Sequence, residues 1–219
     1  MEVSAPFGER KRPIFGGHET FVFRQGWLKK GVDLVETNPT IFSQPDALVR
    51  LGVGKNMVRS IRHWCLATGL IESLPGGSKA ALRPTPLALN LVRDTGWDPY
   101  LEDVGTLWLL HWQLISNLEH SYVWYETFTR FGEQEFTKQR LAHFIERQVQ
   151  LANIQTTSRT LEREVDVCLR TYSATKRKGN SATLESLDCP LVELSLIRTS
   201  RDERTYTFSI GPKPLLPVE

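Results

Sequence analysis

Apolar residues recur at helical spacing along most of the chain, and this pattern predicts a mainly α-helical fold. Helices are expected over residues 27–36, 47–51, 55–68, 87–93, 104–116, 137–154 and 160–172. The helix over 104–116 is apolar on nearly all sides, which predicts that it is buried between its neighbours. Residues 15–23 mix glycine with aromatic side chains and are expected to form a strand or another ordered segment.

Residues 47–86 have the pattern of a winged helix-turn-helix. The helices over 47–51 and 55–68 are separated by a glycine-containing turn, and Gly69 is of the type that ends helices. Short strands are expected at 70–72 and 81–83, around Pro75-Gly76-Gly77-Ser78. The glycine pair permits the positive φ angles of a tight turn, so these strands are predicted to form the wing.

The second half of the chain repeats this order in outline. The helices over 137–154 and 160–172 precede a short helix through Leu191 to Ile197, and then a strand at 205–210. We therefore expect two winged helix-turn-helix units in tandem, with small β wings, joined by a buried helical strut. The expected divisions are a disordered basic arm (1–14), an N-terminal domain (15–96), a helical connector (97–136) and a C-terminal winged-helix-like domain (137–219).

Positive charge is concentrated in the first unit, although the net charge of the 219 residues is only +2. From Arg50 to Arg83 the only acidic residue is Glu72. Such a basic surface is typical of proteins that contact the phosphates of double-stranded DNA. The predicted DNA-contacting residues lie on the helix at 55–68, at the wing tip and in a basic loop of the second half: Lys55, Asn56, Arg59, Ser60, Arg62, Lys79, Lys176, Arg177 and Lys178. The alternative is a winged helix that docks a protein and has a merely solvated basic face.

Composition narrows the class of protein. The chain is 40% hydrophobic and 24% charged, as is usual for soluble globular proteins. No apolar run reaches the roughly 18 residues of a membrane span, and residues 1–13 lack the core of a signal peptide. A cytoplasmic protein without a membrane partner is expected. Cys65, Cys168 and Cys189 are far apart and are predicted to be reduced thiols in the core.

Aromatic residues divide into two predicted groups. Trp64, Trp108 and Trp112 lie on apolar helix faces and are expected in the core. Trp97, Trp124 and Tyr125 have polar neighbours and are candidates for stacking on unpaired bases.

Five stretches of the chain resemble the signature sequences of a bacterial family without an assigned function: residues 15–21, 24–30, 51–58, 98–103 and 211–214. Members occur in gene clusters for phosphorothioation of the DNA backbone, beside a cysteine desulfurase and a sulfur-transfer ATP pyrophosphatase. The member with the most similar pattern is described as a DNA nickase.

This resemblance implies a DNA-binding component of a phosphorothioate modification or defence system, which nicks one strand so that sulfur is introduced. The implied partners are double-stranded DNA, a cysteine desulfurase, an ATPase and a sulfur-transfer protein. The alternative is a non-catalytic DNA-binding regulator or adaptor that recruits the sulfur-transfer machinery. An enzyme acting on small molecules is disfavoured, because Gly52-Val53-Gly54-Lys55 lacks the spacing of a phosphate-binding loop.

Metal-dependent strand cleavage needs two or three carboxylates that converge on Mg²⁺ or Mn²⁺. The nearest group along the chain is Asp98, Glu102 and Asp103, with His111 two helical turns further on. Asp98 and Glu102 are the candidate metal ligands. The alternative for Asp103 is to cap the helix over 104–116.

Two other pairs are candidates for catalysis. His18 and Glu19 are adjacent, and Glu164 lies close to Asp166 along one predicted helix. For both pairs the alternative to catalysis is a structural role. Glu19 would pair with a neighbouring arginine or lysine, and two residues at i and i+2 fall on different faces of a helix.

Overall fold

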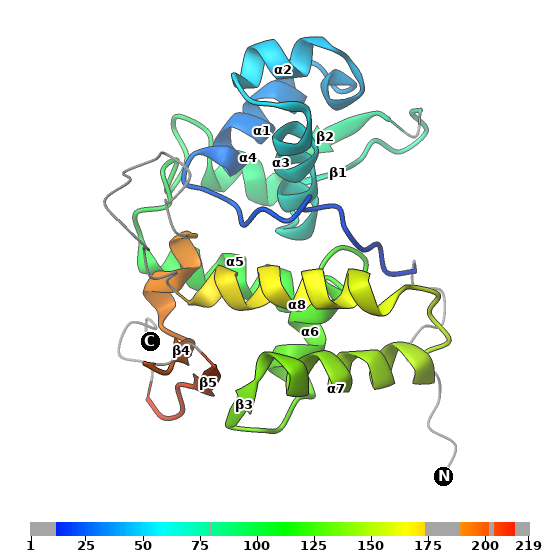
Figure 1. Cartoon of the computed structure of the whole chain (residues 1–219). Coiled ribbons are helices and arrows are strands. Elements are labelled where there is room, and N and C mark those ends of the chain that lie inside the picture. The colour runs from blue at the N-terminus through cyan, green and yellow to red at the C-terminus, as the bar shows by residue number, and fades with distance from the viewer. Residues whose placement is uncertain (1–11, 79, 174–188, 202–203, 213–219) are drawn as a thin grey trace.

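The computed structural model describes residues 12–78, 80–173, 189–201 and 204–212, and these form a mainly helical fold with two small antiparallel sheets (Figure 1). This confirms the expected α-rich class. The helices are α1 (Trp27–Thr37), α2 (Asp46–Leu51), α3 (Lys55–Ala67), α4 (Pro86–Leu91), α5 (Val104–Ser116), α6 (Tyr122–Thr129), α7 (Lys138–Leu151) and α8 (Ser158–Tyr172), with 3-10 turns η1 (Ile41–Ser43) and η3 (Pro190–Leu194). None of the described helices has the length and hydrophobicity needed to cross a membrane.

The first four helices form one half of the molecule together with a two-stranded hairpin. Strands β1 (Ile71–Ser73) and β2 (Leu82–Pro84) are antiparallel, and α1 packs against α3 and β2. Gly52 ends α2 with a φ of 65°, a left-handed conformation that glycine adopts without strain. The chain can therefore turn sharply and begin α3 at Lys55. The helix, turn, helix and hairpin are where the local sequence pattern predicts them.

The second sheet joins distant parts of the chain. Its order is β3-β5-β4, with β3 (Glu135–Thr137), β4 (Ile197–Thr199) and β5 (Thr205–Phe208). The predicted helix through Leu191 to Ile197 is wrong: the 3-10 turn η3 ends at Leu194, Ser195 has a φ of 49°, and Ile197 begins β4. The hydrogen bonds of β4 to β5 replace those of a continuing helix.

Two elements were not expected from the sequence. Helix α6 is composed mostly of aromatic and β-branched residues, which have modest helix propensity. Tertiary burial stabilises it, since Trp124 is 0% exposed. Strand β3 has only three residues and exists through its pairing with β5, some 70 residues later in the chain. Neither element has a strong local signal.

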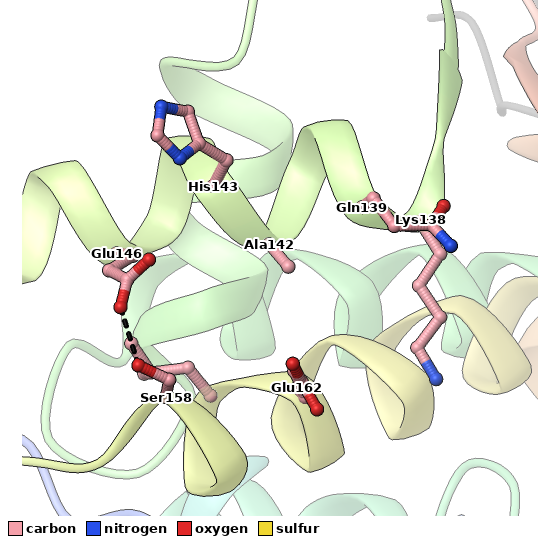
Figure 2. A pocket seen from close by; sticks show the side chains of 8 residues that line it. Lys138, Gln139, Ala142, His143, Glu146, Ser158 and Glu162 are labelled. Atoms are coloured by element: carbon pink, nitrogen blue, oxygen red, sulfur yellow. Dashed lines mark hydrogen bonds between the residues drawn. The ribbon is translucent and has the colours of Figure 1, made fainter.

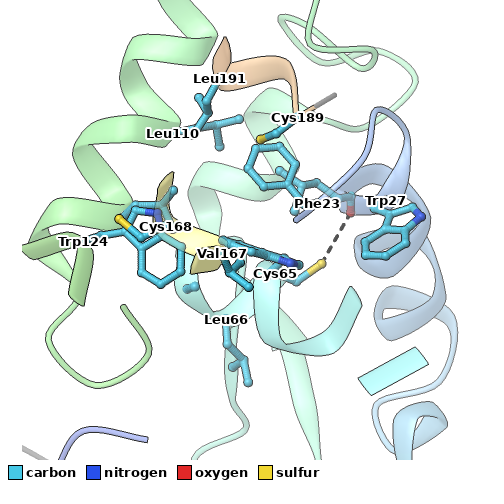
Figure 3. Packing of buried hydrophobic residues seen from close by; sticks show 14 of the residues in the cluster. Phe23, Trp27, Cys65, Leu66, Leu110, Trp124, Val167, Cys168, Cys189 and Leu191 are labelled. Atoms are coloured by element: carbon cyan, nitrogen blue, oxygen red, sulfur yellow. Dashed lines mark hydrogen bonds between the residues drawn. The ribbon is translucent and has the colours of Figure 1, made fainter. Parts of the chain in front are cut away.

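A continuous core connects the two halves of the molecule. The ring centroids of Trp64 in α3 and Trp124 in α6 lie 5.5 Å apart. Figure 3 draws Phe23, Trp27 and Cys65 in the same buried cluster as Trp124 of α6 and Val167 of α8. All three cysteines are buried and none forms a disulfide, which confirms the prediction of core thiols. Burial raises the pKa of the Cys65 and Cys168 thiols, so both are held in the neutral form.

Helix α5 is buried on one side only. Leu107, Leu110 and Leu114 face the core, whereas Trp112 is 63% exposed. The prediction that this helix is buried between its neighbours therefore holds for one side only, because α6 and η3 leave part of α5 uncovered. The prediction that Trp112 is a core residue is wrong. The prediction for Trp124 is also wrong, since this side chain lies in the core and is inaccessible to bases. Trp97 is exposed as expected.

Candidate nucleic-acid interface

Helix α3 places part of its predicted basic face in solvent. Lys55, Asn56 and Arg59 are exposed, and Arg62 is half-buried. Ser60 is 0% exposed, so the expectation that it lies on the outer face is wrong, and His63 on the same helix is 4% exposed. The reason is a second covering layer: a Cβ atom at Gly17 would lie 2.5 Å from His63 Nδ1, which shows how closely residues 15–23 pack on this side of α3.

Residues 15–23, which we call the N-terminal segment, lie between α3 and α8 (Figure 1). The segment forms no strand, but it is ordered as expected. Glu19 accepts a hydrogen bond from Arg59 at 3.1 Å, and Arg170 donates to the carbonyl oxygen of Thr20 at 2.8 Å. The alternative role of Glu19, pairing with a nearby arginine, is thereby confirmed.

His18 lies in the protein interior, beside the carboxylate of Glu164. Its Nε2 atom lies 3.0 Å from Glu164 Oε1, and its Nδ1 atom accepts a hydrogen bond from the backbone of Thr20. The same Glu164 oxygen also accepts from Gly16 N at 2.5 Å. His18 and Glu164 are 1% and 3% exposed. In this arrangement the two candidate catalytic residues His18 and Glu19 have separate partners and do not converge on one point.

The carboxylates around α5 are engaged in local hydrogen bonds. Asp98 Oδ1 accepts from Glu102 N, and Asp98 Oδ2 accepts from Asp103 N, both at 2.9 Å. Asp103 Oδ1 accepts from Gly105 N at 2.6 Å and caps α5, which confirms the capping alternative. Of these three carboxylates, Glu102 alone is exposed and makes no side-chain hydrogen bond to another described residue. Burial raises the pKa of Asp98, but the hydrogen bonds from Glu102 and Asp103 outweigh it and lower the pKa overall.

This arrangement does not fit a magnesium ion held by Asp98 and Glu102. Both Asp98 oxygens already accept backbone N–H groups, and Asp98 is only 7% exposed, so little of its carboxylate is open to a hydrated cation. His111 does not join the group, because its Nδ1 atom lies 2.8 Å from Tyr172 Oη in the core, where burial lowers its pKa to about 4. Over residues 12–78, 80–173, 189–201 and 204–212, no three His, Cys, Asp or Glu side chains form a metal-binding cluster.

A groove of about 390 Å³ lies between α7 and α8 (Figure 2). At one end Ser158 donates to Glu146 at 2.6 Å, and at the other end Lys138 pairs with Asp166 at 2.7 Å (Figure 2). The groove therefore carries both positive and negative charge.

The remaining predicted site residues have different outcomes. Glu164 and Asp166 lie on different faces of α8, as expected, since Glu164 is buried and Asp166 is half-buried. Four predicted DNA contacts, Lys79, Lys176, Arg177 and Lys178, lie outside the described residues.

Asp98→Ala is expected to lower the free energy of unfolding by about 2–3 kcal/mol, because it removes an ionised acceptor of at least two backbone hydrogen bonds. Since the pKa of Asp98 is lowered by folding, this contribution should be complete above about pH 4 and should decline as the pH falls through the lower, folded-state pKa. Denaturant unfolding of both proteins at several pH values measures it.

The neighbouring carboxylates serve as controls for this prediction. Asp103→Ala should cost about 1 kcal/mol through loss of the cap, and exposed Glu102→Ala should change stability by less than about 0.5 kcal/mol. Equal stability of the Asp98→Ala and Glu102→Ala variants at pH 7 would contradict a structural role for Asp98.

Comparison with known proteins identifies similar sequences and structures. The sequence profile of the family described as "Protein of unknown function (DUF4007)" matches residues 15–219. A crystal structure of SspB is similar with a TM-score of 0.80 and 35% sequence identity, and a magnesium-bound crystal structure of SspB has a TM-score of 0.83 and 36% identity. Comparison with curated proteins finds no match.

The similarity to SspB covers 93% of this chain and 62% of the SspB chain, so this chain spans less than two thirds of that protein's length. The shared fold, the identity level and the family match agree with one another and extend over nearly all of the described residues. The chain belongs to the DUF4007 family of proteins of unknown function.

Proposed function

We propose that this protein is a DNA-binding component of a bacterial DNA phosphorothioate modification or defence system. The similarity to SspB across 93% of the chain supports the association with such a system. The observation that carries DNA binding is the exposed cationic surface at the start of α3. Lys55 and Arg50 have no ion-pair partner among the described residues, and Arg59 lies one turn further along the same helix. Phosphates would neutralise these charges.

The order of elements supports a winged-helix assignment for each half. Helices α1, α2 and α3 precede the β1-β2 hairpin, and α6, β3, α7 and α8 precede β4 and β5. In both halves the third helix is followed by an antiparallel hairpin. We assign α3 and α8 as the two DNA-facing helices. Exposed Arg159 and Arg163 then provide the contacts of α8.

Strand nicking is the proposed activity of this component, because the family member whose sequence pattern is most similar is described as a DNA nickase. Magnesium is bound in one SspB structure, which supports a divalent cation as the cofactor to test. A non-catalytic adaptor is the second candidate. The observation that favours it is that the oxygens of Asp98 accept backbone N–H groups and that Asp103 caps α5. The sulfur-transfer proteins would be partners in either case.

A supercoiled-plasmid assay separates the two candidates. The chain is incubated with plasmid in Mg²⁺ or Mn²⁺, with EDTA as the control, and binding to a labelled duplex is measured in parallel. We expect binding that weakens steeply with salt and a metal-dependent conversion of supercoiled plasmid to open circles. Binding without open circles would assign the adaptor role. Absence of duplex binding at low salt would contradict the proposed function as a whole.

A further inference from the structure

A second pocket, of about 360 Å³, lies beside α3. Its walls come from the last turns of α3, from β1, and from the turn between α5 and α6 that carries Asn117, Glu119 and His120. The volume is within the range of about 300–1,000 Å³ that is usual for small-molecule sites. Because the pocket is formed by segments far apart in the sequence, no local sequence motif predicts it.

The walls combine an apolar side with one cation. Ile14, Leu66 and Ile71 provide the apolar side, and Arg62 provides the cation. Arg62 is half-buried and has no ion pair or hydrogen bond among the described residues. Burial lowers its pKa, and no nearby carboxylate offsets this effect. A partly desolvated guanidinium without a partner is poorly stabilised by the protein itself, so an anion that reaches it gains strong charge-assisted hydrogen bonds.

Two carboxylates, Glu72 and Glu119, also line the pocket. The net charge of the pocket depends on whether each of them is paired with a cation. Glu72 is paired with Arg83 on the neighbouring strand, at 2.6 Å, so its charge is neutralised. Glu119 Oε2 lies 3.8 Å from His120 Nε2. Glu119 therefore weakens the attraction for an anion without cancelling the charge of Arg62 through direct contact.

We propose that this pocket binds a nucleotide unit, with its phosphate on Arg62 and its base against Ile14, Leu66 and Ile71. The inference rests on the proposed DNA-binding function, because the pocket opens beside the helix assigned to DNA. A nucleotide matches the lining: the phosphate satisfies the unpaired cation, and the flat apolar base fits the opposite wall. The unit can come from a free mononucleotide or from a single strand, since the recognised chemistry is the same.

Calorimetric titration of the whole chain with deoxyadenosine monophosphate tests this proposal. Arg62→Gln should weaken binding about tenfold or more, the fold-change that corresponds to loss of one charge-assisted hydrogen bond. Glu119→Gln should tighten binding, because it removes the opposing charge. Lys30→Ala, which removes an exposed cation of α1 outside the pocket, is the matched control and should bind as the wild type does.

Further probes define the ligand and separate this proposal from the proposed function. Inorganic phosphate and deoxyadenosine should each bind more weakly than the nucleotide, and equal binding of phosphate would overturn the role of the apolar wall. If a single-stranded oligonucleotide competes with the mononucleotide for the pocket, the bound unit belongs to a strand. If it does not compete, the ligand is a free nucleotide. Two outcomes would overturn the pocket proposal alone. In the first, the chain binds duplex DNA but not the nucleotide. In the second, the Arg62→Gln variant folds and binds the nucleotide as the wild type does. Nucleotide binding without duplex binding overturns the proposed function alone.

Discussion

Glu164→Ala is expected to lower the free energy of unfolding by about 3–5 kcal/mol, the largest effect of any single substitution considered for this protein. Glu164 lies in the interior, where one of its oxygens contacts His18 at 3.0 Å and accepts the Gly16 backbone N–H. Removing the carboxylate takes the ion-pair partner from His18, which is 1% exposed, and the acceptor from the Gly16 N–H. A buried polar group that loses its partner is costly. Equilibrium unfolding in urea measures the difference.

Two further variants show whether the lost contact is responsible. Glu162→Ala removes an exposed carboxylate from the same helix and should change stability by less than about 0.5 kcal/mol. Glu164→Gln keeps an acceptor for Gly16 and should lose less stability than the alanine variant. Because the N-terminal segment depends on this contact, the alanine variant should also expose residues 15–23 to faster hydrogen exchange. Similar stability of the Glu162→Ala and Glu164→Ala variants would refute the buried contact as the anchor of this segment.

Combined replacement of Lys55 and Arg59 by alanine is expected to cause the largest loss of duplex affinity. Each cation that neutralises a phosphate releases a condensed counterion, so removing both should flatten the slope of log affinity against log salt by up to about two units. The contribution of Arg59 should be the smaller of the two, because Glu19 already pairs with it at 3.1 Å. Fluorescence anisotropy over a series of salt concentrations measures both effects.

Single variants provide the matched tests of this surface. Lys30→Ala removes the same charge from α1 and should leave the salt slope nearly unchanged, whereas Lys55→Ala should reduce it by about one unit. Glu19→Gln should strengthen duplex binding, since it removes the negative charge that competes with phosphate for Arg59. Equal slopes for the Lys30→Ala and Lys55→Ala variants would rule out α3 as the contacting helix.

The predicted helices agree with the structure where their signals are local. The start of α3 at Lys55, the turn at Gly52 and the cap of α5 by Asp103 each depend on residues a few positions apart. Side-chain caps and glycine conformations act over that range, so a single sequence carries the information. In contrast, β3 depends on β5, and α6 depends on burial of Trp124, neither of which has a local signature.

The candidate site was predictable only in part, for the same reason. Lys55, Asn56 and Arg59 are exposed as the helical period of α3 indicates. The burial of His63 could not be inferred from that period, because the covering atoms belong to Gly17, 46 residues earlier in the chain. The proximity of Asp98 and Glu102 along the sequence likewise indicated a metal pair, whereas the folded backbone satisfies Asp98 by itself.

The amino-acid sequence by itself determined the helical class, the turn and hairpin around α3, and the concentration of cations there, because these features arise from propensities, caps and composition within short stretches. Only the tertiary structure decided which of those side chains remain accessible and which carboxylates are already engaged. Those outcomes depend on desolvation and on partners such as Glu19 for Arg59 and Glu164 for His18, which lie 40 and 146 residues away in the chain. Burial and pairing at such separations are properties of the packed chain, and no periodic pattern encodes them.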